Sequence, residues 1–285
     1  MDVAIGLQLY SVRESLKRDP WGTLEVLGEL GVRRIEAANH NAAVDDGVGF
    51  GVPADELTER LRTYGLELVG CHVNPLDLDR LPVVLDYHQR VGNRQIGCDI
   101  EFYPYGDRDY VLRRAETFNE IGRLCAERGM RFYYHNHYQE FQELDGTPIY
   151  QLILDHTDPE LVFLELDTYW MYRGGQDPID WMRRYPDRVI LLHQKDFPAD
   201  APQPLNLYDG VVDPSGPITM ESFQATLEPR CFTEIGTGTL PIPAIVAAAE
   251  ALPNFECLLL EQDHTALAEL ESVRVSLEAF GRLTA

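Results

Sequence analysis

Strand-like and helix-like segments alternate along the whole chain, and this alternation constrains the fold more than any other feature. Each candidate strand is a short run rich in β-branched or aromatic residues, often preceded by a glycine or proline that ends a helical pattern. The eight predicted strands are Val3–Tyr10, Arg34–Ala38, Leu66–Val73, Gln95–Ile100, Arg131–His137, Val162–Tyr169, Val189–Lys195 and Glu256–Gln262. Such alternation predicts parallel strands joined by helical crossovers.

Helical patterns fill the intervals between these strands. The predicted helices are Trp21–Leu30, Pro53–Tyr64, Leu78–Arg90, Tyr110–Arg128, Thr147–His156, Pro178–Tyr185, Thr219–Leu227, Ile242–Leu252 and Thr265–Leu283. Eight strand–helix units in 285 residues match the usual size of a (β/α)₈ TIM barrel, an α/β fold, so we predict one barrel domain over residues 1–285. A doubly wound open sheet is the alternative, but the first strand–helix junction lacks the Gly-rich phosphate loop of that fold.

Charge and cysteine content narrow the classes of function. The net charge of −23 would repel a phosphate backbone, and the sequence shows no basic patch, so we expect no nucleic-acid partner. No apolar run is long enough to span a bilayer and the N-terminus does not resemble a signal peptide, which predicts a cytoplasmic protein without a membrane partner. Five scattered cysteines without a C-x-x-C pair indicate buried thiols rather than disulfides or a cysteine zinc site.

Ionisable residues gather at the carboxyl ends of the last four predicted strands. Residues two apart share a face of a strand, and each of these strands ends in such a pair. The pairs are His135 and His137, Glu165 and Asp167, His193 and Lys195, and Glu261 and Asp263. Buried parallel strands are normally apolar on both faces, and the active sites of barrels lie at this end, so these pairs indicate a functional site.

One residue from each of these strands would form a metal site. His135, Asp167, His193 and Glu261 converge at the barrel mouth in this fold, and two imidazoles with two carboxylates suit one divalent cation. Mn²⁺, Co²⁺ or Zn²⁺ fits this donor set better than Ca²⁺, and Mg²⁺ stays an option. Some of the ionisable residues at these strand ends have simpler explanations when each is considered alone. For example, Lys195 could form an ion pair with Asp196.

Other residues near the predicted mouth are candidates for substrate contact. Tyr103 and Trp170 could stack on a sugar ring or simply pack between loops. Glu36 and His72 end earlier strands, where each alone could be a rim residue. The long loops Asn39–Gly51 and Phe197–Gly216 could act as lids, and the glycine pair in Glu234–Gly238 could bind a phosphate. We expect His40, His88, His156 and His264 to face solvent.

These strand ends resemble the sugar phosphate isomerase/epimerase family with the xylose isomerase-like barrel. The resemblance rests on the stretches Gly6–Arg13, Tyr134–His137, Glu165–Trp170, His193–Asp196, Gly236–Gly238 and Glu261–Asp263, which occur in family order. It implies one metal ligand from each of strands five to eight, although many members have glutamate where this chain has His135. Gln8 and Asp263 are then expected to contact substrate, and His137 matches a position that looks catalytic in related dehydratases.

The chemistry implied by this resemblance is proton abstraction next to a carbonyl. A divalent ion would stabilise the enediolate of a ketose or related sugar, giving an isomerase or epimerase. His137 or Glu165 would remove the proton, and Lys195 would stabilise the oxyanion or return a proton.

Three alternatives remain open at this stage. A lyase or hydratase acting on 3-keto-glycosides would use the same metal site and expel a leaving group. A phosphodiesterase on this barrel would need several zinc ions and a basic face, which the net charge disfavours. A non-catalytic sugar-binding barrel would leave costly buried charges unexplained. For the isomerase, epimerase and lyase or hydratase alternatives the partner is a small sugar-like molecule, and a homo-oligomer is an open question.

Overall fold

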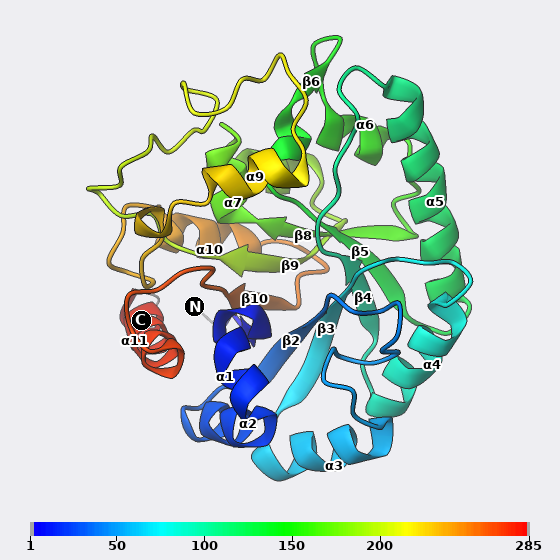
Figure 1. Cartoon of the computed structure of the whole chain (residues 1–285), viewed down its shortest axis with the longest axis vertical. Helices are drawn as coiled ribbons and strands as arrows, with labels where there is room; N and C mark the ends of the chain where they lie inside the picture. The colour runs from blue at the N-terminus through cyan, green and yellow to red at the C-terminus, as the bar shows by residue number, and fades with distance from the viewer. Residues whose placement is uncertain (1–2, 284–285) are drawn as a thin grey trace.

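Eight parallel strands close into a barrel in the computed structural model, which describes residues 3–283. The closing order is β1-β10-β9-β8-β5-β4-β3-β2. The barrel strands are β1 (Ile5–Gln8), β2 (Arg34–Asn39), β3 (Glu67–Val73), β4 (Gln95–Cys98), β5 (Arg131–His135), β8 (Val162–Asp167), β9 (Val189–Gln194) and β10 (Cys257–Leu260). The predicted (β/α)₈ barrel is therefore confirmed. A small hairpin, β6 (Glu143–Leu144) and β7 (Thr147–Pro148), projects beyond it (Figure 1).

Helices surround the barrel (Figure 1). They are α1 (Arg13–Arg18), α2 (Pro20–Glu29), α3 (Ala54–Tyr64), α4 (Leu81–Val91), α5 (Arg108–Ala126), α6 (Ile149–Asp155), α7 (Thr168–Arg173), α8 (Pro178–Arg184), α9 (Met220–Thr226), α10 (Ile242–Glu250) and α11 (Glu269–Leu283). Three single 3₁₀ turns, η1 (Leu9–Val12), η2 (Gln139–Phe141) and η3 (Pro229–Cys231), lie in the connections. Gly65 and Gly92 end α3 and α4 in the left-handed conformation, as the helix–glycine–strand pattern predicts.

The eight strands lie where the sequence predicts them, but several end earlier. Strand β1 gives way to η1 at Leu9, where the Gln8 side chain accepts the Tyr10 N–H. Strand β8 ends at Asp167 rather than Tyr169, because the Asp167 carboxylate caps α7 by accepting the Trp170 N–H. A strong cap overrides the β-propensity of the aromatic residues that follow it. Helices α1 and α7 are too short to give a clear periodic pattern.

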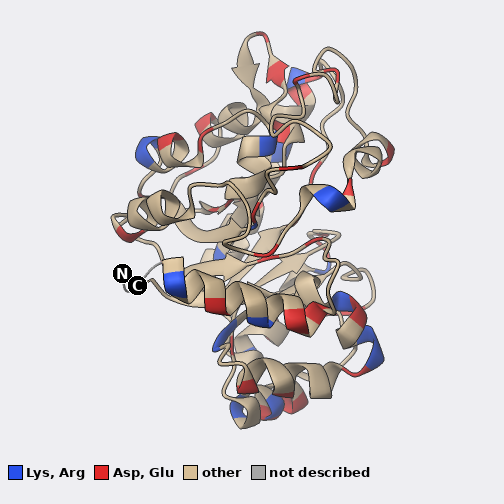
Figure 2. Ribbon diagram, turned by 90° about the vertical axis from the view of Figure 1, so that its left-hand side faces the viewer, with Lys and Arg blue, Asp and Glu red and all other residues tan. Residues whose placement is uncertain are grey.

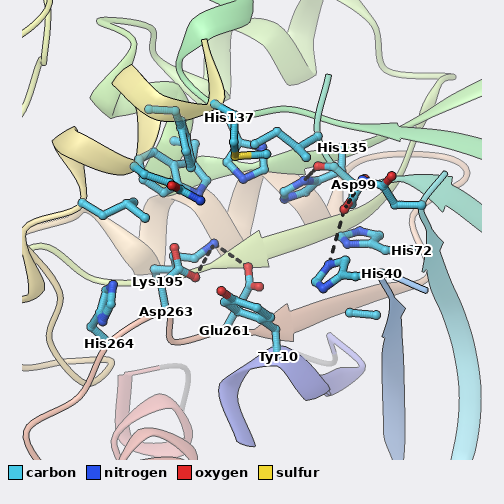
Figure 3. Close-up of a pocket in the computed structure, with 18 residues that line it drawn as sticks. Tyr10, His40, His72, Asp99, His135, His137, Lys195, Glu261, Asp263 and His264 are labelled. Carbon is cyan, nitrogen blue, oxygen red and sulfur yellow. Dashed lines mark hydrogen bonds and ion pairs between the residues drawn. The ribbon is translucent and has the colours of Figure 1, made fainter. Parts of the chain in front are cut away.

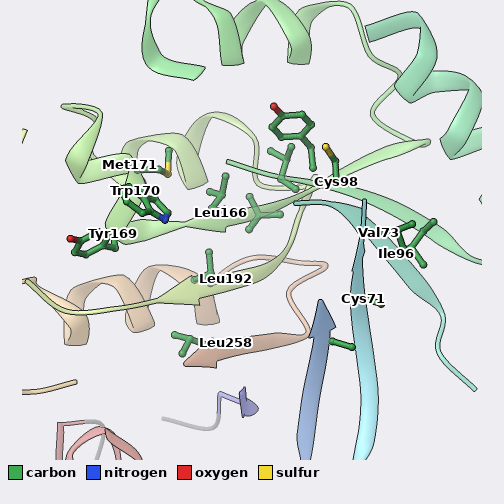
Figure 4. Close-up of a cluster of buried hydrophobic side chains, with 14 of the residues drawn as sticks. Cys71, Val73, Ile96, Cys98, Leu166, Tyr169, Trp170, Met171, Leu192 and Leu258 are labelled. Carbon is green, nitrogen blue, oxygen red and sulfur yellow. The ribbon is translucent and has the colours of Figure 1, made fainter. Parts of the chain in front are cut away.

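The apolar core lies mainly between the strands and the helices. Leu166, Leu192 and Leu258 belong to this layer on β8, β9 and β10 (Figure 4). Residues at alternate positions point into the barrel, where a second cluster contains Tyr133, Leu191, Cys257 and Leu259. Ile190 also belongs to this cluster, at the point where the register between β8 and β9 shifts. Leu191, Leu259 and Tyr133 precede His193, Glu261 and His135 by two residues, so an apolar plug lies beneath the polar mouth.

Other sequence expectations fare differently. Among the described residues all five cysteines are buried free thiols, as predicted. His88 was expected to face solvent but is fully buried in α4, where burial lowers its pKa to about 4. Within residues 3–283, no helix combines the length and apolar character that crossing a bilayer requires. On the face shown in Figure 2, Lys and Arg alternate with Asp and Glu along the outer helices.

The lack of a side chain at Gly97 in β4 makes room for the Tyr133 ring inside the barrel. A Cβ at this residue would lie 2.0 Å from Cε2 of Tyr133, so only glycine lets that ring cross the barrel to donate its hydroxyl to Glu36. We expect Gly97→Ala to lower the free energy of unfolding by about 1–3 kcal/mol through overpacking.

The matched control is Gly281→Ala in α11, where an added Cβ meets no atom within 4 Å in the described structure. This change should be neutral or stabilise by up to about 1 kcal/mol, because alanine favours helices. Urea denaturation of both variants gives the comparison, and equal stabilities would contradict the packing argument.

Candidate metal centre and active site

Four side chains from adjacent strands converge at the barrel mouth. One potential ligand atom from each of His135, Asp167, His193 and Glu261 lies within 4.8 Å of the others, and all four residues are buried. The Nδ1 atom of His193 approaches Oε2 of Glu261 to 2.8 Å, and Nε2 of His135 lies 3.4 Å from Oδ2 of Asp167. The structure thus brings together the four residues proposed as ligands.

A second polar layer lies directly beneath, and His193 belongs to both. Its Nε2 atom lies 2.6 Å from Oε2 of Glu36 and 3.1 Å from Oε1 of Glu165. Nε2 of His72 lies 2.7 Å from Oε2 of Glu165. Glu36 also accepts hydrogen bonds from Gln8 Nε2, at 2.7 Å, and from the Tyr133 hydroxyl. This layer fixes how His193 presents its other ring nitrogen.

The donor set fits a divalent cation on two observations. Nδ1 of His135 contacts the Asp99 carbonyl oxygen at 2.8 Å, which makes Nδ1 the N–H and leaves the Nε2 lone pair available. Nε2 of His135 and Nδ1 of His193 are buried without a hydrogen-bond partner in the part of the chain described, and both approach carboxylate oxygens. Two available imidazole nitrogens beside two buried carboxylates are the composition of a Mn²⁺, Co²⁺ or Zn²⁺ site.

The Lys195 ammonium lies among three carboxylates at the barrel mouth. The ammonium contacts a carboxylate oxygen of Asp167. It also contacts Glu261 and lies 3.7 Å from Oδ1 of Asp263 (Figure 3). Burial alone would lower the pKa of Lys195, but these three carboxylates outweigh it and hold that pKa well above its usual value. Burial raises the pKa of Asp263 to about 7, against the opposing charge of Lys195.

The pKa values of His72 and His137 shift in opposite directions because the neighbours of the two side chains differ. Burial opposes protonation of His72, yet Glu36 and Glu165 raise its pKa to about 9. His137 has no such carboxylate partner, so burial, together with the nearby His135 and Lys195, lowers its pKa well below the usual value. His137 is therefore neutral near pH 7, which is the form that accepts a proton.

A cavity of about 370 Å³ opens above this centre. Its volume falls in the range of about 300–1,000 Å³ typical of small-molecule sites. Ten of the lining residues are labelled in Figure 3. The wall is formed by Tyr10, Ala38, His40, His72, Asn74, Asp99, Ile100, His135, His137, Trp170, Lys195, Met220, Phe223, Gln224, Leu227, Glu261, Asp263 and His264.

Several residues predicted to act on substrate lie away from this wall. Glu165 is fully buried, and both its oxygens face the imidazoles of His72 and His193, so the geometry does not present it as a base. Gln8 and Glu36 lie in the layer beneath the ligands. Tyr103 packs outward, with its hydroxyl 3.0 Å from that of Tyr134. These four residues therefore lie behind the residues that line the cavity.

The glycine pair predicted to cradle a phosphate instead holds a carboxylate of this chain. Oδ2 of Asp196 accepts the N–H groups of Gly236 and Gly238, and Oδ1 accepts that of Leu240. Asp196 therefore does not pair with Lys195 and instead anchors the loop after β9. These N–H groups already have an anionic partner, so they are not free to bind a phosphate.

The sequence reasoning missed several wall residues. His40 is exposed, as expected, and His264 is half-buried, but both residues also line the cavity, which the sequence reasoning did not anticipate. Nε2 of His40 lies 3.3 Å from Oδ2 of Asp99, which also lines the cavity. Their positions just after strands were a usable signal. No wall residue comes from the proposed lid Phe197–Gly216; α9 and the residue after it contribute instead, and no sequence pattern indicated this.

Comparison with known proteins gives the family. The family model described as xylose isomerase-like TIM barrel matches residues 24–260, so this chain belongs to that family. A structure of a sugar phosphate isomerase/epimerase from Parabacteroides distasonis superposes with a TM-score of 0.75 at 22% identity, covering 100% of this chain and 95% of that one. An IolI protein solved with a bound zinc atom gives a TM-score of 0.69 at 12% identity, covering 99% and 98%.

Two similar sequences carry the name inosose dehydratase. An inosose dehydratase of Clostridium beijerinckii is 31% identical over 107 residues, covering 36% of this chain and 33% of that protein. An inosose dehydratase of Geobacillus kaustophilus is 36% identical over 190 residues, covering 55% and 58%. The chain thus matches between about a third and three fifths of the length of these relatives.

The layer beneath the ligands predicts a measurable effect on metal affinity. Glu36→Gln would weaken the hold on the His193 Nε2–H, so we expect the dissociation constant for Mn²⁺ to rise about 10- to 100-fold. Glu256→Gln is the matched control, because Glu256 is a partly exposed acid that pairs with Arg131 outside the site. Titration followed by electron paramagnetic resonance measures both, and unchanged affinity in Glu36→Gln would contradict the role of this layer.

Proposed function

We propose that this chain is a divalent-metal-dependent lyase that acts on a small keto-sugar or keto-cyclitol. It would remove the proton next to the ketone and expel a leaving group from the following carbon. The observation that carries this proposal is the placement of separate acid/base groups on two walls of one cavity. His137 follows β5, whereas Lys195 and Asp263 follow β9 and β10 on the other side (Figure 3).

The residues divide the work of an elimination. His137 takes the proton from carbon, and the C–H electron pair forms the new C=C bond. The bond to the leaving oxygen breaks with its electrons, and that oxygen takes a proton from the Asp263 carboxyl group, whose pKa of about 7 suits proton donation near neutral pH. The Lys195 ammonium, 3.7 Å from Oδ1 of Asp263, stabilises the negative charge that develops. A divalent cation held by His135, Asp167, His193 and Glu261 would supply Lewis-acid stabilisation of the charge that develops on the ketone oxygen.

Two further observations support a lyase of this kind. Elimination needs one group to accept a proton and another to donate one, whereas a 1,2-isomerisation can use a single base on one face of the substrate. The similar sequences named above are inosose dehydratases, which eliminate water. For the metal, the donor set supports Mn²⁺, Co²⁺ or Zn²⁺, and the similar IolI fold was solved with zinc.

An epimerase is the second candidate. Groups on two walls could remove a proton from one face of a carbon and return it to the other, and the similar fold from Parabacteroides distasonis carries the name isomerase/epimerase. The two activities differ in their products. The lyase releases a leaving group, whereas the epimerase changes only the configuration of the sugar.

Replacing the proposed base should separate catalysis from metal binding. We expect His137→Ala to lower kcat about 10²- to 10⁴-fold without loss of bound metal, since His137 lies outside the proposed ligand set. His156→Ala is the control, because His156 is exposed and remote from the cavity. Activity is followed in D₂O as dehydration of an inosose and as p-nitrophenol release from p-nitrophenyl 3-keto-β-D-glucoside.

The outcomes of this assay distinguish the candidates. Product release that depends on His137 supports the lyase. Deuterium incorporation into unchanged or epimerised sugar, without release, would favour the epimerase. Full activity in His137→Ala would refute the assignment of the base.

A further inference from the structure

Helix α9 presents an apolar face to the cavity. Met220, Phe223 and Leu227 line the wall at spacings of three and four residues, which places them on one side of the helix, and Gln224 is the polar residue that α9 adds to the wall. Helix α9 lies beside α7, whose Trp170 ring contacts Phe223 (Figure 1). An apolar stripe on a short helix normally packs on a core, so its position on a cavity wall needs another explanation.

Core packing explains only part of this face. Phe223 is 6% exposed and stacks on Tyr138, with ring centroids 5.5 Å apart. Met220, by contrast, is 45% exposed, and Leu227 is half-buried. These two side chains leave apolar surface in the cavity that protein atoms do not cover, and covering such surface is favourable at roughly 25 cal/mol per Å².

The two halves of the cavity differ in character. The polar half, beside the proposed ligands, carries His40, Asp99, Lys195 and Asp263. The apolar half is formed by α9 and by Trp170, whose ring contacts Phe223. A polyhydroxylated ring alone would match only the polar half. A substrate that fills both halves needs an apolar group attached to its sugar-like part.

Trp170 lies where the two halves meet. Its ring lies 5.3 Å from that of His137 and 5.5 Å from that of Phe223, measured between centroids. The side chain is 2% exposed, and its Nε1–H has no hydrogen-bond partner in residues 3–283. A buried unpaired donor is costly, so this group points to a ligand acceptor, such as an oxygen that joins a sugar to its substituent.

We propose that the α9 face and Trp170 form a subsite for an aryl or similarly flat apolar substituent, so that the substrates are keto-glycosides with an apolar aglycone. This inference rests on the proposed lyase function for the identity of the reacting sugar. The subsite itself is defined by the wall residues alone. Flat rings suit it, because Trp170 and Phe223 offer aromatic surfaces and Met220 adapts its shape.

The test compares binding of two inert glycosides that differ only in this substituent. Isothermal titration calorimetry of the metal-loaded protein measures phenyl β-D-glucoside against methyl β-D-glucoside. We expect the phenyl compound to bind about 10-fold more tightly. In a Met220→Ser/Leu227→Ser double variant this preference should fall below about 3-fold, while the affinity for the methyl compound changes little.

Val83→Ser is the matched control. Val83 is 47% exposed in the first turn of α4, away from the cavity, so its loss removes comparable exposed apolar surface without touching the subsite. Its phenyl preference should equal that of the unmodified chain. Circular dichroism melts confirm that all variants fold, which partial exposure of the replaced residues favours.

The outcomes separate this inference from the proposed function. Equal affinity for both glucosides, no binding of the phenyl compound at about 10 mM, or a preference that survives the double substitution would overturn the subsite. Phenol release from phenyl 3-keto-β-D-glucoside without a phenyl preference would keep the lyase and refute the subsite. A phenyl preference without any release would do the reverse.

Discussion

The bridging imidazole of His193 is the contact on which the rest of the site depends. One ring nitrogen faces Glu261 at the barrel mouth, and the other lies 2.6 Å from Glu36 in the layer below. A buried imidazole held in this way has a fixed orientation and a fixed tautomer, which is how proteins prepare a histidine for a cation. Removing the Glu36 carboxylate would take away the nearer of the two acceptors of the His193 Nε2–H, and a hydrogen bond to a charged group typically contributes about 1.5–3 kcal/mol.

A chain of contacts inside the barrel holds His193 in this orientation. Gly97 admits the Tyr133 ring, the Tyr133 hydroxyl and Gln8 bind Glu36, and Glu36 orients His193. Below this chain of contacts the barrel is apolar, with Leu191 and Leu259 filling its centre. Because water is excluded from beneath, the carboxylates above act in a low-dielectric surrounding, where their attraction for a cation is strong.

The strand pattern and the polar strand ends could be predicted from the sequence because they depend on local periodicity. The alternation of facing residues was enough to bring together His135, Asp167, His193 and Glu261 from four separate strands. Depth within the barrel could not be predicted, because Glu165 and Asp167 share a face and differ only by one layer. The sequence therefore indicates Glu165 as a candidate base, whereas in the structure its carboxylate contacts His72 and His193.

Long connections were the other limit of sequence reasoning. The segment between β9 and α10 spans more than 40 residues, and nothing in its composition distinguishes the half that covers the cavity from the half that does not. A short helix there, α9, forms the apolar wall, whereas the glycine pair that looked like a phosphate loop binds Asp196. Both outcomes follow from tertiary contacts that no local pattern encodes.

Metal content tests the central claim most directly. The protein is purified without added metal or a His-tag, beside separate His193→Ala and Asp167→Ala variants, and each is analysed for Mn, Co, Zn and Mg. Two buried sets of side chains could hold an ion; both contain His193, and only the set at the barrel mouth contains Asp167. We expect about one divalent ion per chain, bound at the mouth, and therefore its loss in both variants. If the unmodified chain, folded and supplied with these metals, binds none, the site is a network of buried ion pairs and the account is wrong.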